Sequence, residues 1–217
     1  MPIVSAPEQR IRHPVFARLY ARCSAGGEAR GVAEHRRRLL AGLHGRVLEL
    51  GAGSGLNFAH YPATVSEVVA VEPEPYLRGC AVGAAEQAPV TVTVIEAAAA
   101  RLPFSDASFD AAVTSLVLCS VAEPAGALRE LRRVLAPGGS LRYYEHVVSH
   151  RPAAARAQCA LDATVWPRIA GGCHLARDTG ALIRAAGFEV ETEERIAVKL
   201  SWAQPTIPHL LGSARAG

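Results

Sequence analysis

The chain has 217 residues, of which 50% are hydrophobic and 20% are charged, and its formal net charge is +3 at pH 7. This length and composition favour one globular domain with a sizeable core and exclude a disordered chain. Lys199 is the only lysine, so no lysine-rich patch indicates a nucleic-acid partner.

The cysteines and the first residues bear on the cellular compartment. The five cysteines are odd in number and form no C-x-x-C pair, so neither a disulfide framework nor a zinc site is indicated, and we expect no metal. We expect reduced thiols in a cytoplasmic protein. Residues 1–12 lack the apolar core of a signal peptide, and no run of about 18 apolar residues occurs, so we expect no membrane span.

Helix and strand patterns alternate along the chain. Two helices are expected first, over 13–23 and 28–41, with a Ser-Ala-Gly-Gly break at 24–27. Strands are expected at 46–50, 67–72, 90–96, 109–118 and 140–146, followed by a hairpin pair at 188–198 and 210–214. Further helices are expected over 76–87, 124–135, 151–169 with a bend at Pro167, and 179–186. This alternation predicts an α/β fold with a parallel sheet that binds ligands at the carboxyl ends of its strands.

Three glycines follow the first predicted strand at intervals of two residues. The apolar run 47–50 is typical of a buried parallel strand, and Gly51, Gly53 and Gly55 let the backbone turn and approach a ligand closely. The second strand ends in Glu72, about 20 residues later, where an acid can accept hydrogen bonds from ribose hydroxyls. Together these features predict binding of an adenosine-containing molecule.

The residues around the glycines disfavour two other nucleotide sites. A dinucleotide fingerprint has the pattern G-x-G-x-x-G, but the third residue after Gly53 is Leu56. A P-loop needs Lys and then Ser or Thr after its last glycine, and here Leu56 and Asn57 follow Gly55. Glu49, just before the loop, would repel a pyrophosphate but attract the ammonium group of an amino acid. An NAD-dependent oxidoreductase is therefore disfavoured.

Three segments resemble motifs of class I S-adenosylmethionine (SAM) methyltransferases and occur in the same order as in those enzymes. Residues 49–55 (ELGAGSG) resemble their first motif, 101–110 (RLPFSDASFD) the segment entering strand four, and 128–139 (LRELRRVLAPGG) the helix and turn before strand five. The resemblance implies a Rossmann-like fold with a mostly parallel seven-stranded sheet, a terminal antiparallel hairpin and helices on both faces. It implies SAM as cofactor and S-adenosylhomocysteine as product. It also implies one domain over 1–217, in which helices in 1–42 cover the site, 43–147 bind SAM and 148–217 bind the acceptor.

The same resemblance assigns roles in binding the cofactor. Glu49 and the glycine loop would line the methionine end of SAM, and Glu72 would bind the ribose. Ala98 takes the place of the acid that many of these enzymes have after strand three. Adenine is therefore expected at the backbone of Ala97 and Ala98, or at Glu96 in a shifted alignment. The full expected set is Glu49, Gly51, Ala52, Gly53, Gly55, Asn57, Phe58, Glu72, Pro73, Ala97, Ala98, Ser115 and Leu116.

A narrower resemblance runs from about residue 40 to the C-terminus. Residues 116–121 (LVLCSV), 144–147 (YEHV), 172–177 (GCHLAR) and 208–212 (PHLLG) are similar to methyltransferase-like proteins that include the alkyl-thiol S-methyltransferases of animal membranes. This implies methyl transfer to a small-molecule acceptor, with a thiol as the known case. The animal enzymes carry an N-terminal hydrophobic anchor, whereas the corresponding region here is short and arginine-rich.

Methyl transfer is an in-line displacement, and a thiol acceptor must first lose its proton. His146, at the end of the fifth strand, and His174, in a glycine-rich loop, are the candidate bases, because imidazole titrates near neutral pH. Asp162 and Glu145 are candidate orienting partners or bases, and Cys119 is interpreted as a small apolar filler. Two alternatives stay open: O-, N- or C-methylation of a natural product, quinone or lipid, and a SAM-binding module without catalysis. The oligomeric state also stays open.

Overall fold

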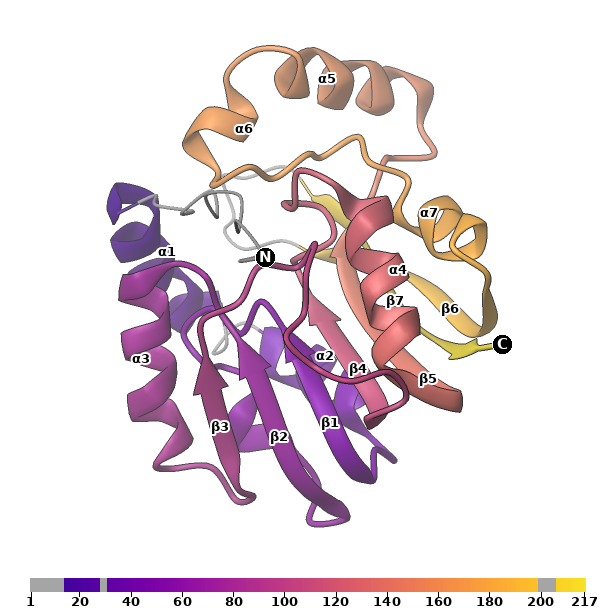
Figure 1. Cartoon of the computed structure of the whole chain (residues 1–217). Helices are drawn as coiled ribbons and strands as arrows, with labels where there is room; N and C mark the ends of the chain where they lie inside the picture. The colour runs from indigo at the N-terminus through magenta and orange to yellow at the C-terminus, as the bar shows by residue number, and fades with distance from the viewer. Residues whose placement is uncertain (1–13, 28–30, 199–205) are drawn as a thin grey trace, which may run out of the picture.

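The computed structural model describes residues 14–27, 31–198 and 206–217. Its strands are β1 (Gly45–Leu50), β2 (Val65–Val71), β3 (Val92–Ile95), β4 (Phe109–Ser115), β5 (Leu135–His146), β6 (Phe188–Val198) and β7 (Ile207–Ala216). Its helices are α1 (Pro14–Gly27), α2 (Ala33–Leu40), α3 (Pro75–Ala85), α4 (Pro124–Val134), α5 (Pro152–Asp162), α6 (Trp166–Ile169) and α7 (Thr179–Ala185), with a 3-10 turn, η2 (Phe58–His60). The strands form one sheet in the order β3-β2-β1-β4-β5-β7-β6 (Figure 1).

The sheet is parallel from β3 to β5 and antiparallel where β7 pairs with its two neighbours. This arrangement confirms the predicted α/β fold, with its mostly parallel sheet of seven strands and its terminal hairpin. The central strands are buried on both faces, because successive side chains of a strand point to opposite sides. In β1, Val47 packs in one hydrophobic core and Leu48 in another, and Val68 and Val69 of β2 divide in the same way. The uninterrupted apolar runs of the sequence follow from this two-sided burial.

Helices cover both faces, as predicted. On one face α4 buries Ala127, Leu128, Leu131 and Val134, whose spacing repeats at the helical period. On the other face α2 buries Leu39 and Leu40 in the second core, together with Ala81 of α3. Within the described parts of the chain, no helix is both long enough and apolar enough to cross a bilayer.

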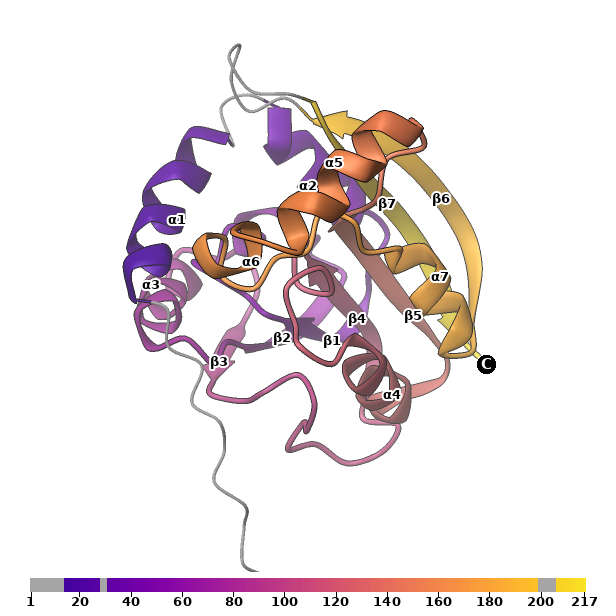
Figure 2. The same cartoon turned by 90° about the horizontal axis from the view of Figure 1, so that it is seen from above.

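The order of the strands creates a switch point between β1 and β4. The chain leaves β1 toward β2 and β3 on one side, whereas β4 leads to β5 on the other. The loops after β1 and β4 therefore diverge, and such a divergence leaves a crevice for a ligand in open α/β sheets. Figures 1 and 2 show α5 and α6 above the edge at which the parallel strands end, with α1 beside it. The elements before β1 and after β5 thus border the predicted binding edge.

Several predicted boundaries are wrong. The break expected at 24–27 is absent, because α1 continues to Gly27. The strand expected to reach residue 118 ends at Ser115, since Leu116 adopts a left-handed backbone with φ of 61°. The helix expected over 151–169 is divided into α5 and α6, so the chain breaks at 163–165 and not at Pro167. Pro167 lies in the first turn of α6, where the missing N–H of a proline costs no helical hydrogen bond.

Candidate cofactor and acceptor site

The glycine loop after β1 has a backbone that side chains disfavour. Gly51 has φ of 67°, and a Cβ added there would lie 2.6 Å from Cγ2 of Val117 in the loop after β4. Gly53 has φ of 57°, but its added Cβ would meet only Tyr20 of α1, at 3.5 Å. Gly51 therefore serves the packing of two loops, whereas Gly53 faces more open space beside α1. Tyr20 also lines a small recess, whose other walls are Arg36, Glu49, Gly51, Ala52, Ser54, Leu56, Asn57 and Ser115.

Glu49, the acid predicted for the methionine end of SAM, is buried in a wall of this recess. Its Oε1 accepts a hydrogen bond from Nδ2 of Asn57 at 2.9 Å, and its Oε2 accepts one from the hydroxyl of Tyr61 at 2.7 Å. Burial raises the pKa of Glu49 to about 7, although both hydrogen bonds act in the opposite direction. A bound cation would favour the ionised form of this carboxyl group.

Arg36 of α2 supplies the opposite charge in the recess, and the sequence analysis missed it. The side chain is buried, and its Nη1 donates to Oδ1 of Asn57 at 2.7 Å and to Oγ of Ser115 at 3.2 Å. Asn57 therefore joins Arg36 to Glu49, and it lies where the sequence predicted a cofactor residue. Three arginines in a row, 36–38, look like a solvated helix face, so the sequence offered no signal that the first of them is buried.

Glu72 follows β2 and holds the glycine loop. Its Oε2 accepts the backbone N–H of Gly53 at 2.7 Å, and its Oε1 accepts that of Glu74 at 2.9 Å. Burial raises the pKa of Glu72 to about 7. The carbonyl of the next residue, Pro73, accepts a hydrogen bond from Nη1 of Arg78 at 3.0 Å. The predicted ribose acid is thus bonded to the glycine loop that the predicted cofactor would contact.

The residues predicted for adenine lie on the loop after β3. Ala97 is buried, and the carbonyl of Ala98 accepts the backbone N–H of Arg101 at 3.1 Å. Glu96, the alternative, is exposed and forms an ion pair with Arg78 at 2.6 Å. None of these three residues belongs to the walls of the recess.

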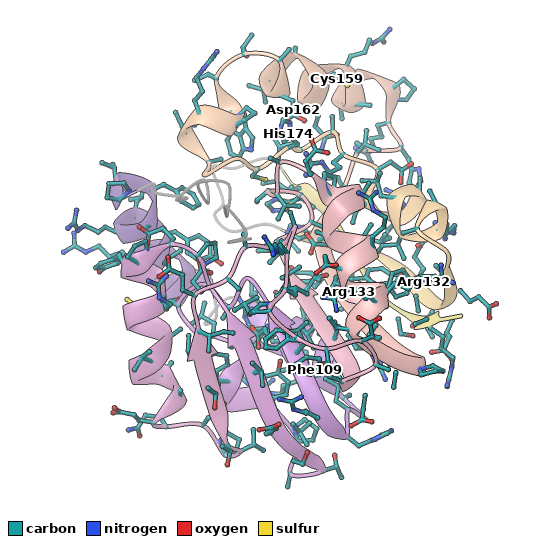
Figure 3. All side chains as sticks on the ribbon, viewed as in Figure 1. Phe109, Arg132, Arg133, Cys159, Asp162 and His174 are labelled. Carbon is teal, nitrogen blue, oxygen red and sulfur yellow. The ribbon has the colours of Figure 1, made fainter. Side chains whose placement is uncertain are left out.

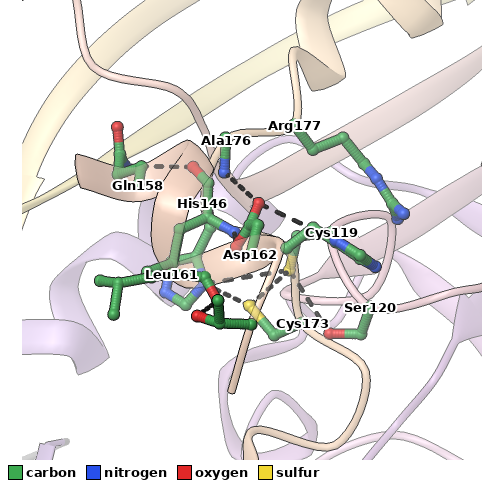
Figure 4. A network of polar contacts seen from close by, with 12 residues as sticks. Cys119, Ser120, His146, Gln158, Leu161, Asp162, Cys173, Ala176 and Arg177 are labelled. Carbon is green, nitrogen blue, oxygen red and sulfur yellow. Dashed lines mark hydrogen bonds and ion pairs between the residues drawn. The ribbon is translucent and has the colours of Figure 1, made fainter. Parts of the chain in front are cut away.

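A second group of polar side chains lies beyond β4 and β5. Nδ1 of His146, at the end of β5, is 3.1 Å from Sγ of Cys173 and 3.9 Å from Sγ of Cys119. The two sulfur atoms are 3.8 Å apart (Figure 4). We call Cys119, Cys173 and His146 the sulfur–imidazole cluster. Glu145 positions it, because its carboxylate accepts the backbone N–H groups of Cys119 and Val117, each at 3.2 Å.

The other predicted catalytic residues organise the loop that carries Cys173. Asp162 accepts the backbone N–H groups of Leu175 and Ala176, both at 2.8 Å. Nδ1 of His174 is 3.8 Å from Oδ2 of Asp162, and its backbone N–H donates to the carbonyl of Cys119 at 2.8 Å. Figure 3 shows His174 next to Asp162, the last residue of α5. The structure therefore brings His146, Asp162 and His174 to one region, where Asp162 is engaged with backbone.

His209 of β7 is a further member of this region that sequence reasoning missed. Its ring lies 4.4 Å from that of His146, edge to face, and stacks on Tyr144 at 5.0 Å. Burial lowers the pKa of His209 to about 3, so the ring is neutral near pH 7. The neutral ring of His209 therefore places no positive charge beside His146. The only sequence signal was the segment 208–212, which carries the narrower resemblance.

Comparison with known proteins agrees with this architecture. Residues 48–143 match the family described as a methyltransferase domain. A thiol S-methyltransferase of the mouse, TMT1B, is 36% identical over 186 residues, which cover 81% of this chain and 73% of the mouse protein. A demethylmenaquinone methyltransferase of Clavibacter sepedonicus is 42% identical, but over 98 residues that cover 44% of this chain and 39% of that protein.

A solved structure extends the likeness of the fold to nearly the whole chain. A SAM-dependent methyltransferase from Thermotoga maritima superposes with a TM-score of 0.69 and 21% identity, covering 94% of this chain and 97% of that one. At this identity the likeness supports the fold alone. The match to TMT1B is closer in sequence, and it covers 81% of this chain. The chain therefore belongs to the class I SAM-dependent methyltransferases, in the family that includes the thiol S-methyltransferases.

Proposed function

We propose that this enzyme transfers the methyl group of SAM to the sulfur atom of a small thiol. The observation that carries the proposal is the recess at the switch point, where a buried carboxylate and a buried guanidinium meet beside the glycine loop. The similarity to a thiol S-methyltransferase supports the choice of acceptor. The similarity to the demethylmenaquinone enzyme covers less than half of this chain, so it supports the acceptor choice less.

The charges of the recess suit the amino-acid end of SAM. That end has an ammonium group and a carboxylate, and it needs an anion and a cation as partners. Glu49 would accept the ammonium group, and Arg36 would bind the carboxylate, because a guanidinium matches the planar geometry of a carboxylate. Gly53 would leave room for the ligand against Tyr20. Ala52, Gly55, Asn57 and Phe58 would shape the loop.

The other parts of the cofactor are assigned from the order of the strands. Glu72 would accept hydrogen bonds from the ribose while it holds the loop, with Pro73 shaping the turn. Backbone groups of Ala97 and Ala98 would border the adenine. Ser115 and Leu116, at the end of β4, would lie along the path from the cofactor to the acceptor.

At the acceptor end, the residues of the enzyme must align the thiol and take its proton. The SAM sulfonium supplies an electrophilic methyl group. His146 is the proposed base, since histidine is the usual general base in proteins and this one ends β5 on the acceptor side. Leu116, Trp166 and Ile207 pack around Cys119 and Cys173 and would exclude water from the reacting atoms. Asp162 and His174 would hold the loop of Cys173 in place.

The three parts of the chain would then have separate tasks. The helices in 1–42 would cover the methionine end of SAM through Tyr20 and Arg36. Residues 43–147 would bind the remainder of the cofactor, and residues 148–217 would supply the acceptor side.

A titration with SAM and a methyl-transfer assay would test the proposal. We expect SAM to bind in calorimetry and small alkyl thiols to be methylated, with the product identified by mass spectrometry. Glu49→Gln should weaken SAM binding, whereas Glu123→Gln should not, because Glu123 is exposed and makes no side-chain cap. Methylation of quinols or phenols without methylation of thiols would refute the acceptor. Binding of SAM without any turnover would refute the proposed reaction.

A further inference from the structure

The sulfur–imidazole cluster joins three parts of the chain that are distant in sequence. Cys119 lies in the loop after β4, His146 ends β5, and Cys173 lies between α6 and α7. Cys119 is fully buried, Cys173 is 6% exposed, and His146 is partly buried. Their sulfur and Nδ1 atoms all lie within 4.8 Å of one another. Two soft thiol ligands and an imidazole so close together form the type of donor set that Zn²⁺ prefers.

The distances fit three corners of a tetrahedron around such an ion. Zinc–sulfur bonds of about 2.3 Å and zinc–nitrogen bonds of about 2.0–2.1 Å place two sulfur ligands about 3.8 Å apart. The same bonds place sulfur and nitrogen about 3.6 Å apart. The observed Sγ–Sγ distance is 3.8 Å, and the two distances from Nδ1 to sulfur are 3.1 and 3.9 Å. Small side-chain movements would complete this geometry.

The surrounding residues hold the three side chains in position. The carboxylate of Glu145 accepts the backbone N–H of Cys119 and so fixes the backbone there. The backbone N–H of His174 donates to the carbonyl of Cys119 and so ties the loop of Cys173 to the loop after β4. His209 packs edge to face against His146. Metal ligands need such support from neighbouring groups, because their orientation determines affinity.

We propose that Cys119, Cys173 and His146 bind Zn²⁺, with an acceptor thiolate as the fourth ligand. Three protein ligands leave one position of a tetrahedral ion open, as catalytic zinc sites do. Among the described residues, the cluster contains no fourth Cys, His, Asp or Glu ligand. The open position suits an exogenous sulfur ligand, because zinc binds thiolates in preference to thiols.

The role of the ion in catalysis rests on the proposed function. The acceptor R–SH would bind the ion as R–S⁻ and release its proton to solvent. The S–CH₃ bond of the product would form as the bond between the methyl group and the SAM sulfonium breaks, and S-adenosylhomocysteine would leave as a neutral thioether. The product R–S–CH₃ is a poor zinc ligand, so it would be released. In this form of the reaction, His146 is a ligand and the ion performs the deprotonation assigned above to the imidazole.

Metal analysis of the reduced, full-length protein tests the site without any assay of activity. We expect about one equivalent of zinc per chain by mass spectrometry of the purified protein. Co²⁺ titrated into the metal-free protein should give the visible bands of a tetrahedral site and a sulfur-to-metal charge-transfer band. Cys119→Ser, Cys173→Ser and His146→Ala should each weaken Co²⁺ binding more than about 100-fold, beyond the loss typical of changes in supporting residues. Cys159→Ser is the matched control, because Cys159 is an exposed free thiol.

The outcomes separate this inference from the proposed function. A wild-type protein that lacks zinc and gives no cobalt spectrum would overturn the metal site, whatever the variants do. The metal site would also be overturned if the intact mass of protein purified with reductant were lower by the two thiol hydrogens of Cys119 and Cys173. Such a mass would indicate a Cys119–Cys173 disulfide, which leaves no thiolate ligands. Methylation of a thiol at full rate by the metal-free enzyme would overturn the role of the ion and leave the function intact. Cobalt binding without SAM binding would support the site and refute the function.

Discussion

Replacement of Gly53 by alanine should affect SAM binding and the stability of the fold to different extents. The added Cβ would lie 3.5 Å from Cε1 of Tyr20, an ordinary contact, so the protein alone has room for it. The cost to folding is then that of a left-handed backbone, with φ of 57°, or about 1–2 kcal/mol. For a chain of this size we expect the melting temperature to fall by about 2–8 °C.

The effect on the cofactor should be larger than the effect on stability suggests. The methyl group would occupy space between the loop and Tyr20 that the methionine end of SAM is proposed to fill. Inserting a methyl group into a packed site costs about 1–3 kcal/mol. The dissociation constant of SAM, measured by calorimetry, should therefore rise by about 5- to 150-fold.

A glycine far from the recess provides the control. Gly138, near the start of β5, has φ of 74°, and a Cβ added there has no neighbour within 4 Å. Gly138→Ala should lower the melting temperature as much as Gly53→Ala does and leave SAM binding unchanged. If both variants bound SAM as the wild type does, Gly53 would not border the cofactor, and the proposed position of SAM would be refuted.

Three further predictions concern acidic residues. Glu49 and Glu72 have pKa values raised to about 7 in the folded protein, so between about pH 4.5 and 7 both groups release protons on unfolding. The free energy of unfolding should therefore fall as pH rises through this window, by at most about 3 kcal/mol for each group. Urea denaturation at several pH values measures this trend, and a Glu49→Gln variant with an unchanged slope would contradict it. Glu72→Ala should weaken SAM binding by about 1–3 kcal/mol, because the glycine loop loses the acceptor of the Gly53 N–H group. An unchanged dissociation constant of SAM in calorimetry would show that the loop needs no such support. Asp162→Ala should leave the backbone N–H groups of Leu175 and Ala176 unpaired and so speed hydrogen exchange within 173–177, with β2 as an internal control. Equal exchange rates in the variant and the wild type would show that other contacts hold the loop.

The strands of the fold were predictable from the sequence because burial leaves a direct pattern. Strands covered on both faces appear as apolar runs, and the short length of the runs of β1, β2 and β4 favours strands over helices. The ends of elements were less predictable. The end of β4 depends on Leu116, a leucine in a left-handed conformation that its residue type does not suggest. The break between α5 and α6 is also absent from the apolar pattern.

The candidate site was predictable only where its residues are close in sequence. The glycine loop and Glu72 follow strands directly, so motif spacing indicates them. Arg36 gave no such signal, because its partners Asn57 and Ser115 come from other elements. The sulfur–imidazole cluster was missed for the same reason. Zinc ligands are recognisable in a sequence as local C-x-x-C pairs, whereas Cys119 and Cys173 are 54 positions apart.

The position of Arg36 has a consequence for how this enzyme can diverge from its relatives. The segment that matches the methyltransferase domain begins at residue 48 and ends at 143, so it contains the glycine loop and Cys119. Arg36 precedes the segment, and His146 and Cys173 follow it. Arg36, the proposed partner of the SAM carboxylate, and two of the three proposed zinc ligands thus lie outside the segment that matches the domain. Substitutions at these three positions are then expected to change the use of the acceptor while the strands β1–β4 and Glu72, which lie elsewhere in the chain, stay intact.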